Sequence, residues 1–323
     1  MNPIASNAEF AAAVDVRTGP AAAGHRRGLT LLMLIATFCW ATNIIAGKEA
    51  LRGFSALALA QMRVSGTSAI YVALFLTRRR RPSIRRSRRD WVFFGLVALF
   101  GVTLNQLFFI GGLARTSAAH TALIVALGPV MVLALSRMMR MEALGLLKSA
   151  GILVSFWGVA VLTMGKGEGR NGAHWQGDLR AFAASGVFAC FTILVKKAAV
   201  QSDALTLNTI VFTLGSVLLL PFTAAELLAV RWSAIPPLAW WSLAYMVILG
   251  SVVAYLLFAF ALAELTPARV AAFNYLQPLI AISLGVWMLG EKLTSGLMAG
   301  GALILVGLYM TERERDRSPS YER

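Results

Sequence analysis

The sequence contains ten stretches of mostly apolar residues, each close to the length that crosses a lipid bilayer as an α-helix. A spanning helix needs about 20 such residues, because the hydrocarbon core of a bilayer is about 30 Å thick. The stretches cover residues 29–47, 55–76, 91–112, 117–136, 144–164, 179–199, 204–225, 238–260, 267–288 and 295–310. The segments between them are too short for a soluble catalytic domain. The sequence therefore predicts an all-α polytopic membrane protein with ten transmembrane helices.

The charge of the chain supports the same class. Only 14% of the residues are charged, whereas a soluble domain has about 25%. The net charge of +15 is concentrated in alternate loops, above all in the run Arg78–Arg89, as the positive-inside rule requires. This pattern predicts cytoplasmic N- and C-termini in a bacterial-type inner membrane. It favours contact with anionic lipid and no nucleic-acid partner. Residues 1–28 and 313–323 are expected to be cytoplasmic tails, the first of them disordered.

The chain also carries an internal repeat. A single fixed offset aligns two prolines, two glutamates and four glycines: Pro129 with Pro278, Glu142 with Glu291, Gly151 with Gly300, and Gly158 with Gly307. Each repeat, residues 29–165 and 178–312, holds five spans. Five is an odd number, so the second repeat must enter the membrane upside down. Inverted repeats of this kind are a transporter architecture with the substrate site near the middle of the membrane.

Several segments resemble a known family. They are FCWATNIIAGKEAL from Phe38, LAQMRVSG around Arg63, TALIVALGPVMVLALS, MEALGLLKSAGILVSFWGVAVL, and YLQPLIAISLGVWMLGEKLTSGLMAGGALILVGLYM from Tyr275. They are similar to the paired EamA domains of the drug/metabolite transporter superfamily, over residues 29–312. The resemblance implies a ten-helix secondary exporter of metabolites such as amino acids. It also implies a central cavity lined mainly by spans 1, 3, 4, 6, 8 and 9.

Two prolines are predicted hinges. Pro129 and Pro278 lie at equivalent places in spans 4 and 9. A proline inside a helix frees the carbonyl four residues earlier, here those of Val125 and Asn274. Freed carbonyls at this depth must face protein, water or substrate. A hinge that also offers an acceptor to the substrate is one interpretation, and a tolerated structural kink is the other.

Polar and aromatic residues inside the spans are the candidate substrate-binding residues. Polar groups are costly in lipid and are expected to point inward, either into the cavity or as hydrogen-bonding links between helices. The candidates are Trp40, Asn43, Asn105, Gln106, Tyr255, Asn274, Tyr275 and Gln277.

Four charged residues are predicted to be structural anchors: Lys48, Arg63, Glu142 and Glu291. Glu142 and Glu291 lie in equivalent turns of the two repeats. Arg63 lies within span 2, where a second interpretation is that it binds a substrate carboxylate. His120 lies near the outer end of span 4, where an interface residue is more typical than a proton relay. No Asp or Glu falls well inside a span, so no buried carboxylate relay is predicted.

The favoured function is an exporter of small metabolites, amino acids or related compounds or drugs, that works by alternating access. The alternatives are a nucleotide-sugar or sugar-phosphate exchanger of the same superfamily, and a membrane-embedded enzyme. No HExxH, G-x-S-x-G or Walker A motif is present. The two cysteines and three histidines are scattered, and no metal or cofactor is expected. Glycines of spans 5 and 10 predict close packing of these helices, or a dimer face, so the chain is expected to be a monomer or a homodimer.

Overall fold

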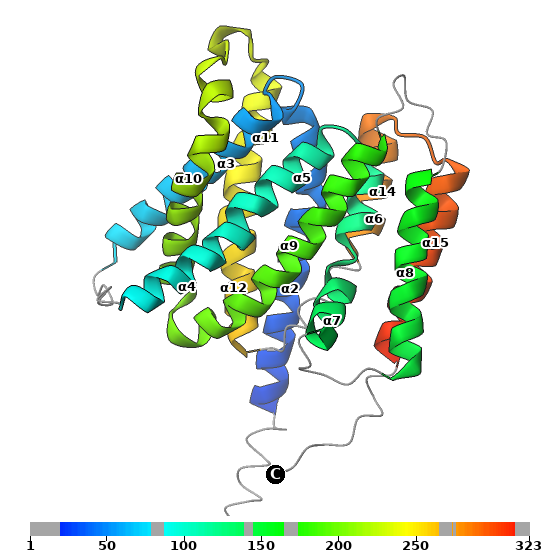
Figure 1. Cartoon of the computed structure of the whole chain (residues 1–323). Coiled ribbons are helices and arrows are strands. Elements are labelled where there is room, and N and C mark those ends of the chain that lie inside the picture. The colour runs from blue at the N-terminus through cyan, green and yellow to red at the C-terminus, as the bar shows by residue number, and fades with distance from the viewer. Residues whose placement is uncertain are drawn as a thin grey trace, which may run out of the picture.

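A computed structural model describes residues 20–78, 87–138, 145–164, 174–264, 273 and 276–313 of the chain. These residues form helices and no strand, and the helices make up the ten predicted spans (Figure 1). Seven spans are long and apolar enough to cross a membrane by themselves, and three are shorter apolar helices. The predicted fold class is confirmed.

The first five spans are built from eight elements. They are α2 (Pro20–Ala50), α3 (Ala56–Leu76), α4 (Arg88–Ala98) with η1 (Leu99–Leu104) and α5 (Asn105–Leu113), α6 (Ala118–Val125) with α7 (Gly128–Met138), and α8 (Leu146–Met164). The other five are α9 (His174–Gln201), α10 (Ala204–Leu228), α11 (Pro237–Val247) with η3 (Ile248–Val253) and α12 (Ala254–Glu264), α14 (Leu276–Leu289) and α15 (Ser295–Arg313). The single turn η2 (Trp232–Ala234) connects α10 to α11.

The two repeats run in opposite directions. A Cβ atom on Gly151 of α8 would lie 2.7 Å from the carbonyl oxygen of Gly307 in α15. A Cβ atom on Gly158 would lie 2.9 Å from the carbonyl oxygen of Gly300. As the residue number rises along α8, its partner's number falls along α15, so these equivalent helices are antiparallel and packed within one chain (Figure 1). The close helix contact predicted from these glycines is therefore intramolecular.

Spans 3 and 8 each contain a π-helical segment at the same place in the repeat. η1 begins at Leu99 and ends at Leu104, and η3 begins at Ile248 and ends at Val253, which are the repeat equivalents of those residues. A π-helix bonds i to i+5 and leaves backbone carbonyls without their usual helical partners. Such segments often lie at functional sites. The residue pattern did not predict these segments.

Two boundaries differ from the predicted ones. α2 begins at Pro20, inside the segment expected to be disordered, because proline suits the first helical turn and the alanines that follow favour a helix. Span 4 is not one kinked helix: it breaks at 126–127, and Pro129 lies in the first turn of α7. Pro278 is the third residue of α14 as described, and the two residues before α14 lie outside the described part of the chain. Asn274, whose carbonyl was expected to be freed, lies outside the described residues.

Candidate functional site

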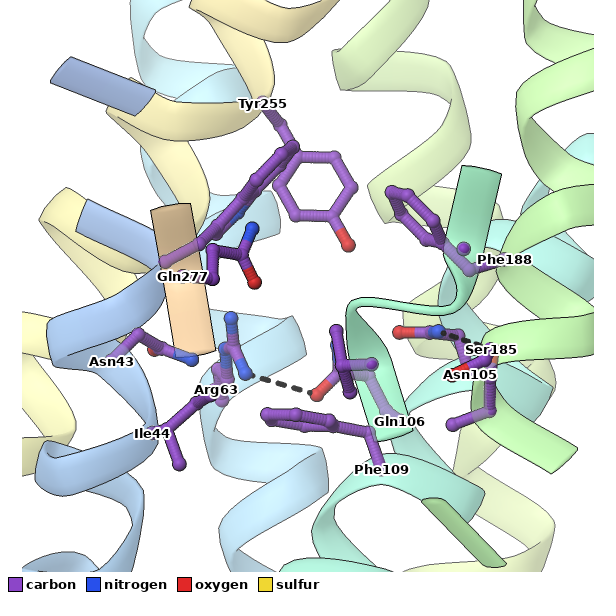
Figure 2. Close-up of a pocket in the computed structure, with 14 residues that line it drawn as sticks. Asn43, Ile44, Arg63, Asn105, Gln106, Phe109, Ser185, Phe188, Tyr255 and Gln277 are labelled. Atoms are coloured by element: carbon purple, nitrogen blue, oxygen red, sulfur yellow. Dashed lines mark hydrogen bonds between the residues drawn. The ribbon is translucent and has the colours of Figure 1, made fainter. Parts of the chain in front are cut away.

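A cavity lies in the interior of the bundle between the two repeats. The cavity and its mouth together hold about 610 Å³ of empty space. Figure 2 draws 14 described residues that line it. The lining residues come from both repeats: Trp40, Asn43, Ile44, Arg63, Asn105, Gln106, Phe109, Val125, Gly128, Ala184, Ser185, Phe188, Tyr255 and Gln277.

Arg63 of α3 is the one basic side chain among the described lining residues, and only 3% of its surface is exposed. Its Nε donates to the Ser251 hydroxyl at 2.9 Å and its Nη2 to the Gly250 carbonyl at 3.3 Å. Its Nη1 donates to the Gln106 amide oxygen at 3.3 Å (Figure 2). A guanidinium has five N–H donors, so these bonds leave donors available to a ligand. Among the described residues, no carboxylate forms an ion pair with Arg63.

The π-helical segment η3 provides backbone carbonyls that accept hydrogen bonds from side chains of α3. Arg63 binds the carbonyl of Gly250 in η3, and Tyr71 of α3 donates its hydroxyl proton to the carbonyl of Val252 at 2.8 Å. Side chains of α3 therefore satisfy carbonyl groups of the irregular segment. The cost of burying the guanidinium is in turn offset by these acceptors. The local irregularity of span 8 and the buried charge of span 2 stabilise each other.

Gly250 is also needed because Asn43 occupies the space beside it. A Cβ atom on Gly250 would lie 2.2 Å from Asn43 Oδ1 and 3.1 Å from Asn43 Cβ. The equivalent glycine of span 3, Gly101, meets the Phe191 ring in the same way, also at 2.2 Å. The two repeats thus share one packing geometry but place an amide in one copy and a phenyl ring in the other.

Aromatic rings form the other side of the cavity. Trp40 makes edge-to-face contacts with Phe188, Tyr255 and Phe258, at ring-centre distances of 6.1, 5.7 and 5.2 Å. Such pairs are favourable beyond the area that they bury. Figure 2 shows the Tyr255 hydroxyl, the Gln277 amide and the Arg63 guanidinium around one central space. The cavity therefore combines a cationic, amide-rich side with an aromatic side.

Six of the eight candidate substrate-binding residues line this cavity: Trp40, Asn43, Asn105, Gln106, Tyr255 and Gln277. Asn274 and Tyr275 lie outside the described residues. Asn105 donates from Nδ2 to the Ala184 carbonyl at 3.4 Å and so also links span 3 to α9. Val125, the last residue of α6, is in the lining as well.

The predicted anchors have different surroundings. Glu291 accepts hydrogen bonds from the backbone N–H groups of Ala118 and Ala119, at 2.6 and 3.0 Å, and so caps the N-terminus of α6. Lys48, near the end of α2, donates to the carbonyl of Thr116 just before α6. Glu142 lies outside the described residues. We call this end of the bundle, where α2 ends and α6 and α9 begin, the α6 end.

Sequence reasoning missed a buried carboxylate at the α6 end. Asp178 of α9 is 1% exposed, although the predicted span began one residue after it. The Thr116 hydroxyl donates to Asp178 Oδ1 at 2.5 Å, and His120 Nδ1 lies 3.0 Å from Asp178 Oδ2. These partners stabilise a carboxylate where hydropathy alone would end the helix. Within the described residues, no cluster of three or more His, Cys, Asp or Glu side chains could hold a metal ion.

Comparison with known proteins places the chain in a family. The model of the EamA-like transporter family matches it twice, over residues 28–164 and 175–313. The chain belongs to the EamA-like transporter family. Members of this family are transporters and not enzymes, and the multi-pass membrane architecture described above agrees with that assignment. An experimentally determined structure titled "Crystal structure of protein" has the same fold, with a TM-score of 0.64 and 19% identity over 91% of this chain and all of that one.

Individual relatives carry transporter names. An uncharacterized transporter of Archaeoglobus fulgidus is 30% identical over 87% of this chain and 96% of its own length. A probable terminal-alkyne amino-acid exporter of Streptantibioticus cattleyicolor is 25% identical over 87% and 92% of the two chains. A probable amino-acid metabolite efflux pump of Salmonella typhimurium is 26% identical over 86% and 93%.

Proposed function

We propose that this EamA-family protein is a secondary transporter that exports small carboxylate-bearing metabolites, amino acids or related compounds, by alternating access. Arg63 carries the proposal: it is a buried guanidinium in the cavity lining, without a carboxylate partner among the described residues. A substrate carboxylate meets that charge with two parallel hydrogen bonds, the geometry that guanidinium groups favour. The names of two relatives, an amino-acid exporter and an amino-acid metabolite efflux pump, agree with this class.

The aromatic side of the cavity narrows the substrate further. A carboxylate held at Arg63 leaves the rest of the substrate facing Trp40, Phe188 and Tyr255. Aromatic rings favour apolar side chains and cationic groups, the latter through their π faces. An amino acid with a large apolar side chain fits both sides of the cavity. A sugar nucleotide or sugar phosphate needs several cations, whereas the described lining offers one.

The proposed orientation puts the α6 end outside the cell. The basic run Arg78–Arg89 lies at the opposite end of α3 from the α6 end, which places it in the cytoplasm by the positive-inside rule. Both termini are then cytoplasmic. Export begins when substrate enters the cavity from the cytoplasm, and it is completed when the two repeats separate at the α6 end.

Efflux from loaded liposomes tests the proposal. Vesicles that contain the purified protein are filled with amino acids, polyamines, sugars and dyes, and released compounds are identified by mass spectrometry. We expect selective release of amino acids with large apolar side chains, and at least a roughly tenfold loss of release in Arg63→Gln, since a charged hydrogen-bonding partner is worth about 1.5–3 kcal/mol. Arg231→Gln changes an exposed arginine and serves as the control. Unselective release, or full release by folded Arg63→Gln protein, would contradict the proposal.

A further inference from the structure

His120 and Asp178 form a buried pair at the α6 end that the proposed substrate site does not use. His120 Nδ1 lies 3.0 and 3.2 Å from the two carboxylate oxygens of Asp178. His120 is 9% exposed and Asp178 is 1% exposed. The Thr116 hydroxyl donates to the same carboxylate, at 2.5 Å. A titratable ring and a carboxylate are therefore held together away from bulk solvent.

The pair joins the two repeats. His120 belongs to α6 of the first repeat and Asp178 to α9 of the second. Beside Asp178, a Cβ atom on Gly177 would lie 2.7 Å from the backbone nitrogen of Thr116, so the two repeats touch closely here. Separation of the repeats at this end must break the His120–Asp178 contact.

The pair also lies between the cavity and the α6 end. From His120, α6 continues to Val125, and from Asp178, α9 continues to Ser185; both of these residues line the cavity. The Ser185 hydroxyl donates to the Ile124 carbonyl at 2.9 Å, so the same two helices stay in contact down to the cavity. α6 and α9 therefore form part of the barrier between the cavity and the α6 end.

The strength of this contact depends on the charge of the ring. Histidine is the side chain that most often changes charge near neutral pH. A neutral ring that donates from Nδ1 makes a charge-assisted hydrogen bond to the carboxylate, and a protonated ring adds the attraction between two opposite charges in a poorly solvated place. Protonation of His120 therefore stabilises the conformation in which the repeats touch at the α6 end.

We propose that the His120–Asp178 pair is a proton-binding site that holds the transporter closed at the α6 end. Proton uptake favours the closed conformation and proton release permits opening to the outside. The inference rests on the alternating-access movement of the proposed function. Other charged groups lie at the α6 end: Lys48 and Glu49 of α2, Arg52 in the turn after it, Arg115 in the turn before α6, Arg180 of α9, and Glu291 in the turn after α14. Substitution of His120 separates its contribution from theirs.

A distance measurement tests the proposal without any substrate. Arg52 in the turn after α2 and Trp175 at the start of α9 are exposed at the α6 end, one in each repeat. Both are replaced by cysteine and spin-labelled in the full chain, in lipid nanodiscs, with Cys39 and Cys190 replaced by alanine. Pulsed electron paramagnetic resonance then gives the closed and open populations between about pH 5 and about pH 8.

We expect the ratio of closed to open populations to rise about fivefold on acidification, which corresponds to about 1 kcal/mol. His120→Gln keeps a donor for Asp178 but cannot take up a proton, so its ratio should not change with pH. His174→Gln removes another histidine of α9 and should keep the full response. If His120→Gln does not fold, the Asp178→Asn variant is measured instead, and its ratio of closed to open populations should likewise not change with pH.

Two results would overturn the proposal. The first is no pH response in the spin-labelled protein that keeps His120 and Asp178, and the second is an unchanged response in a folded His120→Gln or Asp178→Asn protein. Either result leaves the proposed function standing if amino-acid release from liposomes at constant pH is selective. Failure of that release assay alone leaves the proton site standing, because the distance measurement contains no substrate.

Discussion

Ser155 and Ile304 are 149 residues apart, and the Ser155 hydroxyl donates a hydrogen bond of 3.5 Å to the Ile304 carbonyl oxygen. This separation is the offset of the internal repeat, so two equivalent residues touch each other. Equivalent positions can meet only where a pseudo-two-fold axis passes between them. Trp40 and Phe188, at equivalent places in spans 1 and 6, also contact each other. The axis therefore runs through the α8–α15 contact and through the cavity.

The side chains around the cavity depart from this symmetry. Asn43 corresponds to Phe191 and Gln106 corresponds to Tyr255. The N-caps of the equivalent helices α3 and α10 are Ser55 and Asp203. Counted from these caps, the repeat equivalent of Arg63 is Val211. The symmetric backbone permits equivalent movements of the two repeats, while the asymmetric side chains give the cavity one polar and one aromatic side.

The contact of α8 with α15 predicts a strict need for glycine. Gly158→Ala should destabilise the protein by about 1–3 kcal/mol, because the new Cβ would lie 2.7 Å from the backbone nitrogen of Ile304. Thermal unfolding in detergent measures the change. Gly95→Ala is the control, since a Cβ atom there meets nothing within 4 Å. Equal unfolding temperatures for the two variants would contradict the packing described here.

Two buried glutamines should separate transport from stability. Gln277 lines the cavity, so Gln277→Leu should lower amino-acid efflux at unchanged membrane abundance. Gln61 lies between α3 and α10, where it donates to Ser65 at 2.8 Å and accepts from Thr223 at 2.8 Å. Gln61→Leu removes the hydrogen bonds that link α3 to Ser216 and Thr223 of α10, and it should lower abundance instead. Normal efflux by Gln277→Leu at matched abundance would remove that residue from the site.

The fold could be predicted from the sequence because membrane spans appear as long apolar stretches and the repeat appears as residues that recur at one fixed offset. Apolar length locates a span, and the matched pair Glu142 and Glu291 reveals the repeat. The cavity residues could be predicted in part for the same reason. An amide such as Asn105 or Gln277 inside an apolar run must face protein or the cavity, although its pattern alone does not distinguish the two.

The remaining features depend on three-dimensional partners. The π-helical segment η3 is stabilised by Arg63 and Tyr71, which lie far away in sequence on α3. Asp178 is buried because Thr116 and His120 reach it from another helix. Hydropathy evaluates each residue alone, so it gives a paired carboxylate the same cost as an unpaired one.

Glu291 is predicted to act on stability before transport. Glu291→Gln removes the negative charge from the N-terminus of α6, where a carboxylate is favourable and such caps contribute about 1 kcal/mol. Membrane abundance and unfolding temperature should fall while efflux per molecule persists. Glu226→Gln, on the exposed side of α10, is the matched control. Intact abundance with lost transport would instead place Glu291 in the transport cycle.

Asp203 gives a pH-dependent test at the other end of the bundle, where it caps α10 just outside the span. Burial tends to raise the pKa of its carboxyl, but hydrogen bonds from Thr206 and the guanidinium of Arg78 outweigh burial, so the pKa lies below the ordinary 3.8. A lowered folded-state pKa stabilises the protein at pH values above 3.8, and this contribution is lost as the pH falls through the folded-state pKa. Because the side chain is 40% exposed, the contribution should be small, about 0.5 kcal/mol.

Asp203→Asn tests this contribution, since asparagine caps a helix as well as aspartate but carries no charge. The variant should be less stable than the parent near neutral pH, and the difference should disappear once the parent carboxyl is protonated. Ser55→Ala removes the equivalent cap of α3, whose hydroxyl accepts from the Ala58 N–H, and its loss of stability should be the same at every pH. Denaturant unfolding in detergent across the acid range measures both. A constant difference for Asp203→Asn would show that the carboxylate charge adds nothing to this cap.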